Sequence, residues 1–425
     1  MALKQEHEGQ GANHENSAAL PRVEKGSMLD LCAGIHWDTE DCHFSDWRYL
    51  PNINLWRDYL PLEIEAQLQN QSIAAHVNHV YPAGELVEGF QSSQVKQLKL
   101  NQFQPDQSGH SQALLQVGRF FSKDSFKGVD GIYQGNKFPC RVVAIDDQYV
   151  TVDFNHPLAS RDINLELVIE QIKSAAAERG GRCNDIPALL CDYGPGMQAN
   201  PEQQPIGFSS PNAIKTLDQS KEEDFFASAN LEPFWDKTAL NQVTSLYNEL
   251  LSDDMDILDL MAGVHSPLQQ ASIRPAHVFC AGLNRSELEA NPICADRQLI
   301  NVNDANALAG FEDARFDAVL IHAAIEYVTN PHDLMHQIGR ILKPGGRIII
   351  SFSNRSMQGK AINIWHELDE FERPALVLGY LKNAHCYTAF NSYSMRGRFR
   401  PEDDQLSSQL LYSDPVYAVW ANRVS

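Results

Sequence analysis

The sequence predicts an α/β domain with a doubly wound parallel sheet in its carboxy-terminal half, preceded by a β-rich (α+β) module. Beyond residue 236, apolar runs alternate with segments of helical periodicity, which is typical of a parallel sheet covered by helices. Before residue 175 the runs are short and strand-like, and residues 176–235 are rich in Gly, Pro, Gln, Ser and Asp. We therefore expect a disordered tail at 1–28, a β-rich module at 29–175, a linker at 176–235 and the α/β domain at 236–425.

The composition excludes some classes of protein. The 34 Lys and Arg residues stand against 55 Asp and Glu residues, a formal net charge of −21 over 425 residues, which disfavours generic nucleic-acid binding. A local basic patch remains at Arg396, Arg398 and Arg400. No stretch is apolar for about 18 residues, so we expect no membrane span.

The eight cysteines contain no CxxC pair and no dense cluster, which favours reduced thiols in a soluble, cytoplasmic protein. Four possible metal ligands occur at Cys32, His36, Cys42 and His43, but their spacing matches no standard zinc pattern. We therefore expect no metal site.

In the amino-terminal module, the clearest element is a β-hairpin. Residues 141–145 and 149–152 are β-branched or alternating runs, and Asp146-Asp147 lies between them as a turn.

In the carboxy-terminal half, apolar residues at helical spacing predict a helix over 239–251. A second helix is expected at 285–290 with Asn284 as its cap, and a third begins after Asn330 with Pro331 at its first position and ends at Lys343, before Pro344-Gly345-Gly346. The predicted strands are 255–260, 276–282, 298–304, 316–321 and 347–353.

Polar residues follow several of these strands. Because the carboxyl ends of parallel strands meet at one edge of a doubly wound sheet, Asp259, Asn284, Asp304 and His322 are expected to face one crevice. The alternative is that the strands of a parallel sheet simply end in polar residues, without any ligand.

Residues 316–355, with a strand, a helix, LKPGG and a second strand, resemble the class I S-adenosylmethionine-dependent methyltransferases, especially the type 11 branch. The resemblance extends over about 236–425, and DPVYAVWANR is similar to the family's antiparallel final strand. It implies S-adenosylmethionine as cofactor and a small-molecule or protein methyl acceptor. No catalytic side chain can be named, because methyl transfer mainly requires that the two reactants be held in line.

The same resemblance implies a set of cofactor contacts. Asp259 and Gly263 correspond to the positions near the methionine part, Asn284 to the ribose position, Asp304 and Ala305 to the adenine segment, and His322 to the floor after the fourth strand.

Three positions depart from the family pattern. Met261 and His265 replace glycines of the first loop, and Asn284 replaces an acidic residue, so Asn284→Asp is expected to tighten cofactor binding. The alternative is a scaffold domain whose cofactor loop has decayed.

Residues 117–172 resemble the carboxyl portion of the SlyD-like FKBP-type prolyl isomerases, most specifically in VDFNHPLAS before a strand. The resemblance implies contacts to an unfolded polypeptide at Phe126, His156, Leu158 and Leu165, the last in place of the family's pocket Phe. The alternative functions for the chain are therefore a prolyl isomerase or folding helper with a degenerate methyltransferase scaffold, and a non-catalytic interaction protein.

Overall fold

The computed structural model describes residues 21–104, 115–174, 180–192, 194, 208, 212–228 and 232–425. Most of the expected tail, residues 1–20, lies outside the described residues. The strands are β1 (Met28–Asp38), β2 (Cys42–Asn54), β3 (His76–Tyr81), β4 (Val95–Lys99), β5 (Phe120–Ser122), β6 (Pro139–Ile145), β7 (Tyr149–Asp153), β8 (Ile163–Lys173), β9 (Asp256–Leu260), β10 (His277–Gly282), β11 (Asp296–Leu299), β12 (Phe316–His322), β13 (Leu342–Phe352), β14 (Tyr387–Arg396) and β15 (Val416–Arg423). The α-helices are α1 (Leu62–Leu68), α2 (Ile186–Cys191), α3 (Glu222–Phe225), α4 (Lys237–Leu250), α5 (Arg285–Ala290), α6 (Pro331–Ile341), α7 (Asn363–Glu367) and α8 (Arg373–Asn383).

One sheet of 11 strands runs through the molecule in the order β11-β10-β9-β12-β13-β15-β14-β2-β1-β8-β3. From β11 to β13 neighbouring strands are parallel, and β15 is inserted antiparallel between β13 and β14. The doubly wound sheet predicted for the carboxy-terminal half is therefore present, and the antiparallel final strand is confirmed.

Both faces of this parallel sheet are covered, because successive residues of a strand point to opposite faces. Ile348 and Ile350 of β13 join the core that contains α6 and α8, whereas Ile349 joins the core that contains α4 and α5. Near-continuous apolar runs in β12 and β13 are the sequence signature of such two-sided burial.

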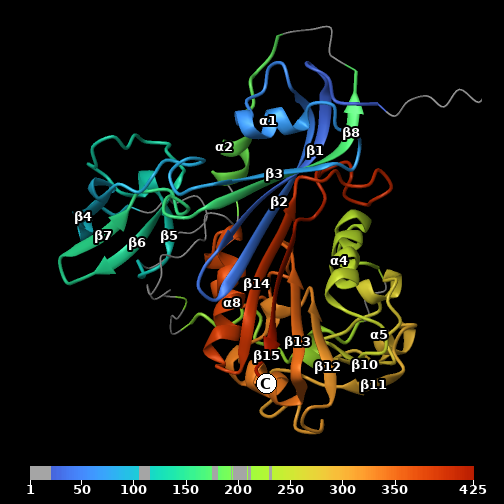
Figure 1. The fold of residues 1–425 in the computed structure, drawn as a ribbon. Helices are drawn as coiled ribbons and strands as arrows, with labels where there is room; N and C mark the ends of the chain where they lie inside the picture. Colours follow the sequence, from blue (N-terminus) through green and yellow to red (C-terminus); the bar gives the residue numbers. More distant parts are fainter. Residues whose placement is uncertain are drawn as a thin grey trace, which may run out of the picture.

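The amino-terminal strands extend the same sheet. Phe390 to Arg396 of β14 pair in parallel with Cys42 to Arg48 of β2, and β1, β8 and β3 follow as antiparallel neighbours (Figure 1). The amino- and carboxy-terminal halves thus share one continuous sheet.

A separate four-stranded antiparallel sheet, β4-β7-β6-β5, projects to one side (Figure 1). The predicted hairpin at Asp146-Asp147 is confirmed as its β6–β7 pair. This sheet has its own apolar core, in which Phe126 contacts Phe103 and Phe154. Arg119 and Glu372, both buried and 3.0 Å apart, join it to the carboxy-terminal half.

The helices predicted after Asn284 and Asn330 begin at those caps, whereas the helix predicted over 239–251 begins at Lys237. The side chains of Asp236, Asn284 and Asn330 accept backbone N–H bonds at the starts of α4, α5 and α6. The third strand of the carboxy-terminal half is different from its prediction. It comprises Asp296–Leu299 instead of 298–304, and all four residues are exposed.

The cysteine prediction requires a correction. Cys280 on β10 and Cys294 before β11 form a disulfide, so the expectation of reduced thiols throughout is wrong for this pair. Both residues are buried.

In the parts of the chain that the structure describes, no helix combines the length and apolar character needed to cross a bilayer.

Two further segments are held in place by specific contacts. Within the predicted linker, α2 packs its Ile186 and Leu190 into the main core.

Each arginine of the predicted basic patch forms ion pairs with acidic residues. Arg396 contacts Asp46, and Arg398 contacts Glu170. Arg400 contacts three carboxylates, those of Asp236, Asp404 and Asp414. This patch is therefore an ion-pair network rather than an open basic surface.

Candidate cofactor site

A cavity of about 260 Å³ lies at the carboxyl ends of β9, β10 and β12. Its floor comes from the loops that follow these strands, and its cover comes from residues 222–228 and 232–235. The lining includes Met261, Gly263, His265, Gly282, Asn284, Glu287, Asn303, His322 and Tyr327 from the floor and Glu222, Phe225, Phe226, Glu232, Phe234 and Trp235 from the cover.

The first loop, residues 261–265, keeps a glycine-like path although it has lost glycines. Met261 has a φ of 62°, in the left-handed region that glycine adopts readily. Gly282 allows the loop to approach β10, because a Cβ there would lie 2.3 Å from the carbonyl oxygen of Ala262. The buried Asn291 then holds the loop by donating to the carbonyl oxygen of Gly263 at 2.8 Å.

Asn284 contacts the cover of the cavity. Its amide nitrogen donates to the carbonyl oxygens of Phe226 (2.9 Å) and Ala227 (3.0 Å), while its oxygen accepts from the backbone N–H of Glu287. The side chain is therefore engaged in positioning the cover and capping α5.

Glu287 supplies a carboxylate one turn further along α5. It lines the cavity, and its Oε2 lies 3.1 Å from the position that a Cβ would take on Gly263. This carboxylate therefore reaches the first loop, where Asn284 does not.

The cover is aromatic and is fixed from several sides. The Trp235 ring meets His322 edge-on, with 4.5 Å between ring centroids, and Phe226 meets Tyr327 at 5.9 Å. Arg355 donates to the carbonyl oxygen of Phe234 and lies 4.7 Å from the Phe234 ring centroid.

His322 is a neutral residue in this environment. Burial lowers its pKa to about 3, and its Nδ1 lies 2.9 Å from the Ser351 hydroxyl, which in turn is 3.3 Å from the Tyr247 hydroxyl. A histidine with so low a pKa is a weak base near neutral pH.

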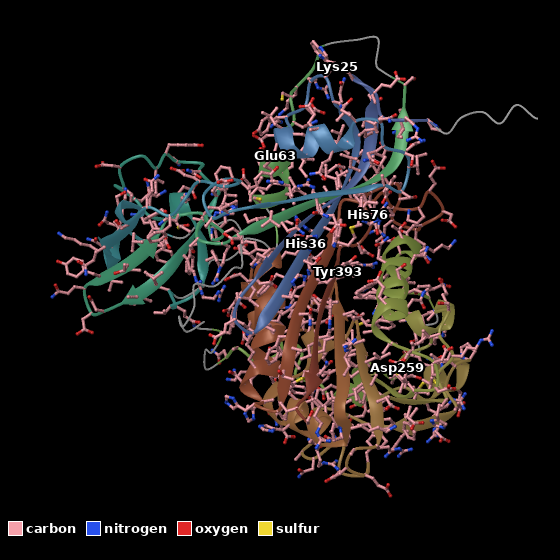
Figure 2. The ribbon with its side chains drawn as sticks, viewed as in Figure 1. Lys25, His36, Glu63, His76, Asp259 and Tyr393 are labelled. Carbon is pink, nitrogen blue, oxygen red and sulfur yellow. A yellow bond between two sulfur atoms is a disulfide. The ribbon has the colours of Figure 1, made fainter. Side chains whose placement is uncertain are left out.

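Two buried carboxyls lie close to the cavity but do not line it. Burial raises the pKa of Asp259 to about 6, although a hydrogen bond from Ser266 opposes the shift, and raises the pKa of Glu326 to about 7. Asp259 is on the central strand β9, where Figure 2 labels it, and one carboxylate oxygen of each residue has no hydrogen-bond partner among the described residues.

The structure thus brings together only some of the residues that the sequence suggested. Gly263, Asn284 and His322 line the cavity, Asp259 is buried in the sheet, and Asp304 and Ala305 are exposed and outside the lining. Asn303, directly before them, lines the cavity and donates to the carbonyl oxygen of Tyr327 at 3.1 Å.

Sequence reasoning missed Glu287, Asn303 and the aromatic cover. Glu287 carried a usable signal as an acidic residue in the first turn of the helix capped by Asn284. The cover carried none, because residues 222–235 have no periodic pattern and were expected to belong to the linker.

The cavity fits a sulfonium cofactor. Three carboxylates, Glu222, Glu232 and Glu287, line it, and its described lining contains no Lys or Arg. Neutral His322 adds no positive charge, so a cation bound here would meet no like charge from these groups.

A second, larger cleft of about 800 Å³ lies in the amino-terminal half, between the α1 and α2 region and the four-stranded sheet. Of the four residues predicted to contact a polypeptide, His156 lines this cleft, whereas Phe126, Leu158 and Leu165 are buried in the cores.

Among the described residues, no group of three or more His, Cys, Asp or Glu side chains is arranged to hold a metal.

Comparisons with known proteins concern both halves. Residues 258–350 match the family described as "Methyltransferase domain". A demethylmenaquinone methyltransferase from Clavibacter sepedonicus is 36% identical over 97 residues, covering 22% of this chain and 39% of that protein. A ubiquinone biosynthesis O-methyltransferase from Maricaulis maris is 28% identical over 116 residues, covering 26% of this chain and 46% of that protein.

In the amino-terminal half, the FKBP-type peptidyl-prolyl cis-trans isomerase SlyD from Yersinia pestis is 34% identical over 65 residues, covering 13% of this chain and 33% of that protein. The matches therefore span less than half the length of each of these three relatives.

Solved structures of similar proteins include an S-adenosylmethionine-dependent methyltransferase from Mesorhizobium loti, with 14% identity and a TM-score of 0.29 over 43% of this chain and 100% of that chain. The sequence match at 258–350 includes the carboxyl ends of β9, β10 and β12, where the cavity lies. Residues 258–350 of the carboxy-terminal half therefore match a methyltransferase domain, and the cofactor that this match supports is S-adenosylmethionine.

Proposed function

We propose that the chain transfers the methyl group of S-adenosylmethionine to an acceptor that enters the cavity beneath residues 222–228 and 232–235. The observation that carries this proposal is the position of the cavity, at the carboxyl ends of β9, β10 and β12 inside the matched segment. S-adenosylmethionine supplies an electrophilic methyl group on a sulfonium cation. The task of the protein is then to bind, orient and exclude water.

Each part of the lining has a role in this proposal. The first loop around Gly263 holds the methionine part, Glu287 accepts hydrogen bonds from the ribose hydroxyls, and Asn303 lies on the adenine side. A carboxylate accepts two such bonds, which suits a pair of vicinal hydroxyls. Asp259 supports the first loop from beneath, and Asp304 and Ala305 lie outside this set of contacts.

The acceptor in this proposal is a small molecule with a flat apolar ring. Phe225, Phe226, Phe234, Trp235 and Tyr327 surround the space on the cover side, and aromatic rings pack well against other rings. Two of the relatives are named a demethylmenaquinone methyltransferase and a ubiquinone biosynthesis O-methyltransferase, which supports the same class. Because neutral His322 is a weak base, the acceptor must reach the site with a nucleophilic atom that needs little help from the protein.

Titration calorimetry of the full chain with S-adenosylmethionine tests the proposal. We expect measurable heat, and we expect Glu287→Gln to weaken binding about tenfold or more, because a hydrogen bond to a charged group contributes roughly 1.5 to 3 kcal/mol. Glu289→Gln on the same helix is exposed and outside the lining, so it should leave the affinity unchanged. A folded protein that gives no heat at millimolar cofactor would refute the proposal.

We also propose that the amino-terminal half is an FKBP/SlyD-like module that binds unfolded polypeptide, and that the chain divides into residues 29–175, 176–235 and 236–425. Support comes from the partial similarity to SlyD and from the cleft between the α1 and α2 region and the four-stranded sheet. The buried positions of Phe126, Leu158 and Leu165 favour holding over isomerisation, because no dry aromatic pocket is formed by them. A proline isomerisation assay with the full chain tests this, and an efficient rate would contradict it.

A further inference from the structure

The cleft in the amino-terminal half has two unlike walls. One consists of the start of α1, residues 85–89 and α2, and the other is formed by the four-stranded sheet with its loops. Figure 1 shows α1 and α2 beside this sheet. With a volume of about 800 Å³, the cleft is in the range of sites that enclose a sizeable ligand.

Apolar side chains are open to solvent along this cleft. Tyr59 is 53% exposed and Leu62 is 76% exposed, and both lie where the chain enters α1. Leu86 and Phe138 add partly buried apolar surface from the two walls. These side chains would bury further apolar area only if something occupied the cleft.

Carboxylates surround the same cleft, and they come from both walls. They are Glu63, Glu85, Glu88, Asp130, Asp185 and Asp192. Figure 2 labels Glu63 on α1. None of the six takes part in an ion pair within the described parts of the chain. Burial raises the pKa of Asp192, and the nearby charge of Asp185 adds to this shift.

Little positive charge lines this cleft. Lys123 is the one Lys or Arg in the described lining, and its Nζ donates to the carbonyl oxygen of Phe154 at 2.8 Å. His156 is neutral near pH 7, because burial lowers its pKa to about 4. Its Nε2 lies 3.2 Å from the carbonyl oxygen of Cys191. The cleft is therefore negative as well as partly apolar.

We propose that this cleft binds an extended, cationic segment of a partner polypeptide, in which lysine or arginine residues are interspersed with apolar ones. The proposal rests on the polypeptide-binding role proposed above and adds the charge of the partner. Apolar side chains of the segment cover Tyr59, Leu62 and Phe138, and its cations face the carboxylates of both walls. The net charge of the whole chain, −21, adds long-range attraction for such a partner.

Fluorescence anisotropy with the full chain and a labelled, unstructured peptide tests the charge. In the first peptide lysines alternate with leucine and tyrosine, and in two otherwise identical peptides glutamine or glutamate replaces every lysine. We expect the lysine peptide to bind most tightly and the glutamate peptide least. Added salt should weaken binding of the lysine peptide, because the Debye length shortens to about 8 Å at 0.15 M.

A matched pair of variants locates the binding site. Glu85→Gln, Glu88→Gln and Asp130→Asn combined remove three exposed carboxylates from the cleft and should weaken the lysine peptide about tenfold, since exposed ion pairs are individually weak. Glu40→Gln, Glu312→Gln and Glu402→Gln combined remove the same charge from exposed positions outside the cleft. This control should change affinity by much less.

The outcomes separate the two proposals. If all three peptides bind alike, or if the two triple variants weaken binding equally, the cleft has no selectivity for cations and this inference is wrong, while polypeptide binding stands. If none of the peptides binds the folded chain, polypeptide binding itself is refuted. The order lysine, glutamine, glutamate, with loss confined to the cleft variant, supports the inference.

Discussion

At the scale of single residues, Asn284 shows how one side chain links the cover of the cavity to its floor. Its amide donates to two carbonyl oxygens, of Phe226 and Ala227. In Asn284→Asp a carboxylate would face both carbonyls and lose both hydrogen bonds, so we expect weaker cofactor binding, about tenfold, and not the tighter binding that the sequence suggested. Calorimetry measures this, with Asn306→Asp, exposed and outside the lining, as a control for added charge. Tighter binding by Asn284→Asp would instead place residue 284 on the ribose.

The raised pKa of Glu326 predicts how the free energy of unfolding depends on pH. Burial raises its pKa from 4.5 to about 7, so between these values the folded protein holds a proton that the unfolded chain has released. The free energy of unfolding therefore falls as pH rises from about 4.5 to 7, and it does not recover above 7. Glu326→Gln lacks this dependence, so its stability relative to wild type should rise by about 2 to 3 kcal/mol from pH 4.5 to pH 7. Denaturant unfolding at both pH values checks this, and a constant difference would contradict it.

At the scale of elements, the disulfide closes a loop around α5. Cys280 and Cys294 are separated by 14 positions, and the residues between them include Asn284 and Glu287. A cross-link over a loop of about 15 residues is worth roughly 3 kcal/mol. We expect Cys280→Ala with Cys294→Ala to lower the free energy of unfolding by about that amount and to weaken cofactor binding, while Cys183→Ala, at an exposed free cysteine, changes neither. A double variant with unchanged affinity would show that the loop holds its shape without the cross-link.

Helices and strands could be predicted from the sequence where their own residues carry the signal, as caps, prolines or apolar faces. α6 combines a cap, a proline and one apolar face, and β12 and β13 are apolar because both of their faces are covered. β11 was misplaced because DRQL is polar and exposed, so nothing in its residues marks a strand. Because β11 ends at Leu299, residues 303 and 304 lie in the turn that follows it, where Asn303 lines the cavity and Asp304 is exposed.

At the scale of the whole molecule, the shared sheet could not be predicted from the sequence. The pairing of β2 with β14 is made by backbone groups of segments more than 300 residues apart, and backbone hydrogen bonds leave no residue pattern. The predicted division at 176–235 remains a prediction, but the two sides of it are joined by strand pairing and by the Arg119–Glu372 ion pair. Strands of the amino-terminal half therefore belong to the same hydrogen-bonded sheet as the segment that matches the methyltransferase family.

This junction predicts unequal effects for two ion pairs that cross it. Asp46 on β2 is 1% exposed and accepts hydrogen bonds from Ser394 (2.6 Å) and Arg396 (2.9 Å) on β14, whereas Asp41 is exposed and pairs with Lys382 at 2.9 Å. Asp46→Asn removes a buried charge from its hydrogen-bonded arginine, which costs about 3 kcal/mol, while Asp41→Asn should cost less than about 1 kcal/mol. Denaturant unfolding followed by tryptophan fluorescence measures both. Because one sheet joins the halves, Asp46→Asn should lower the unfolding midpoint of both halves together. If the amino-terminal half of the variant unfolds alone and cofactor binding is retained, the halves are independent.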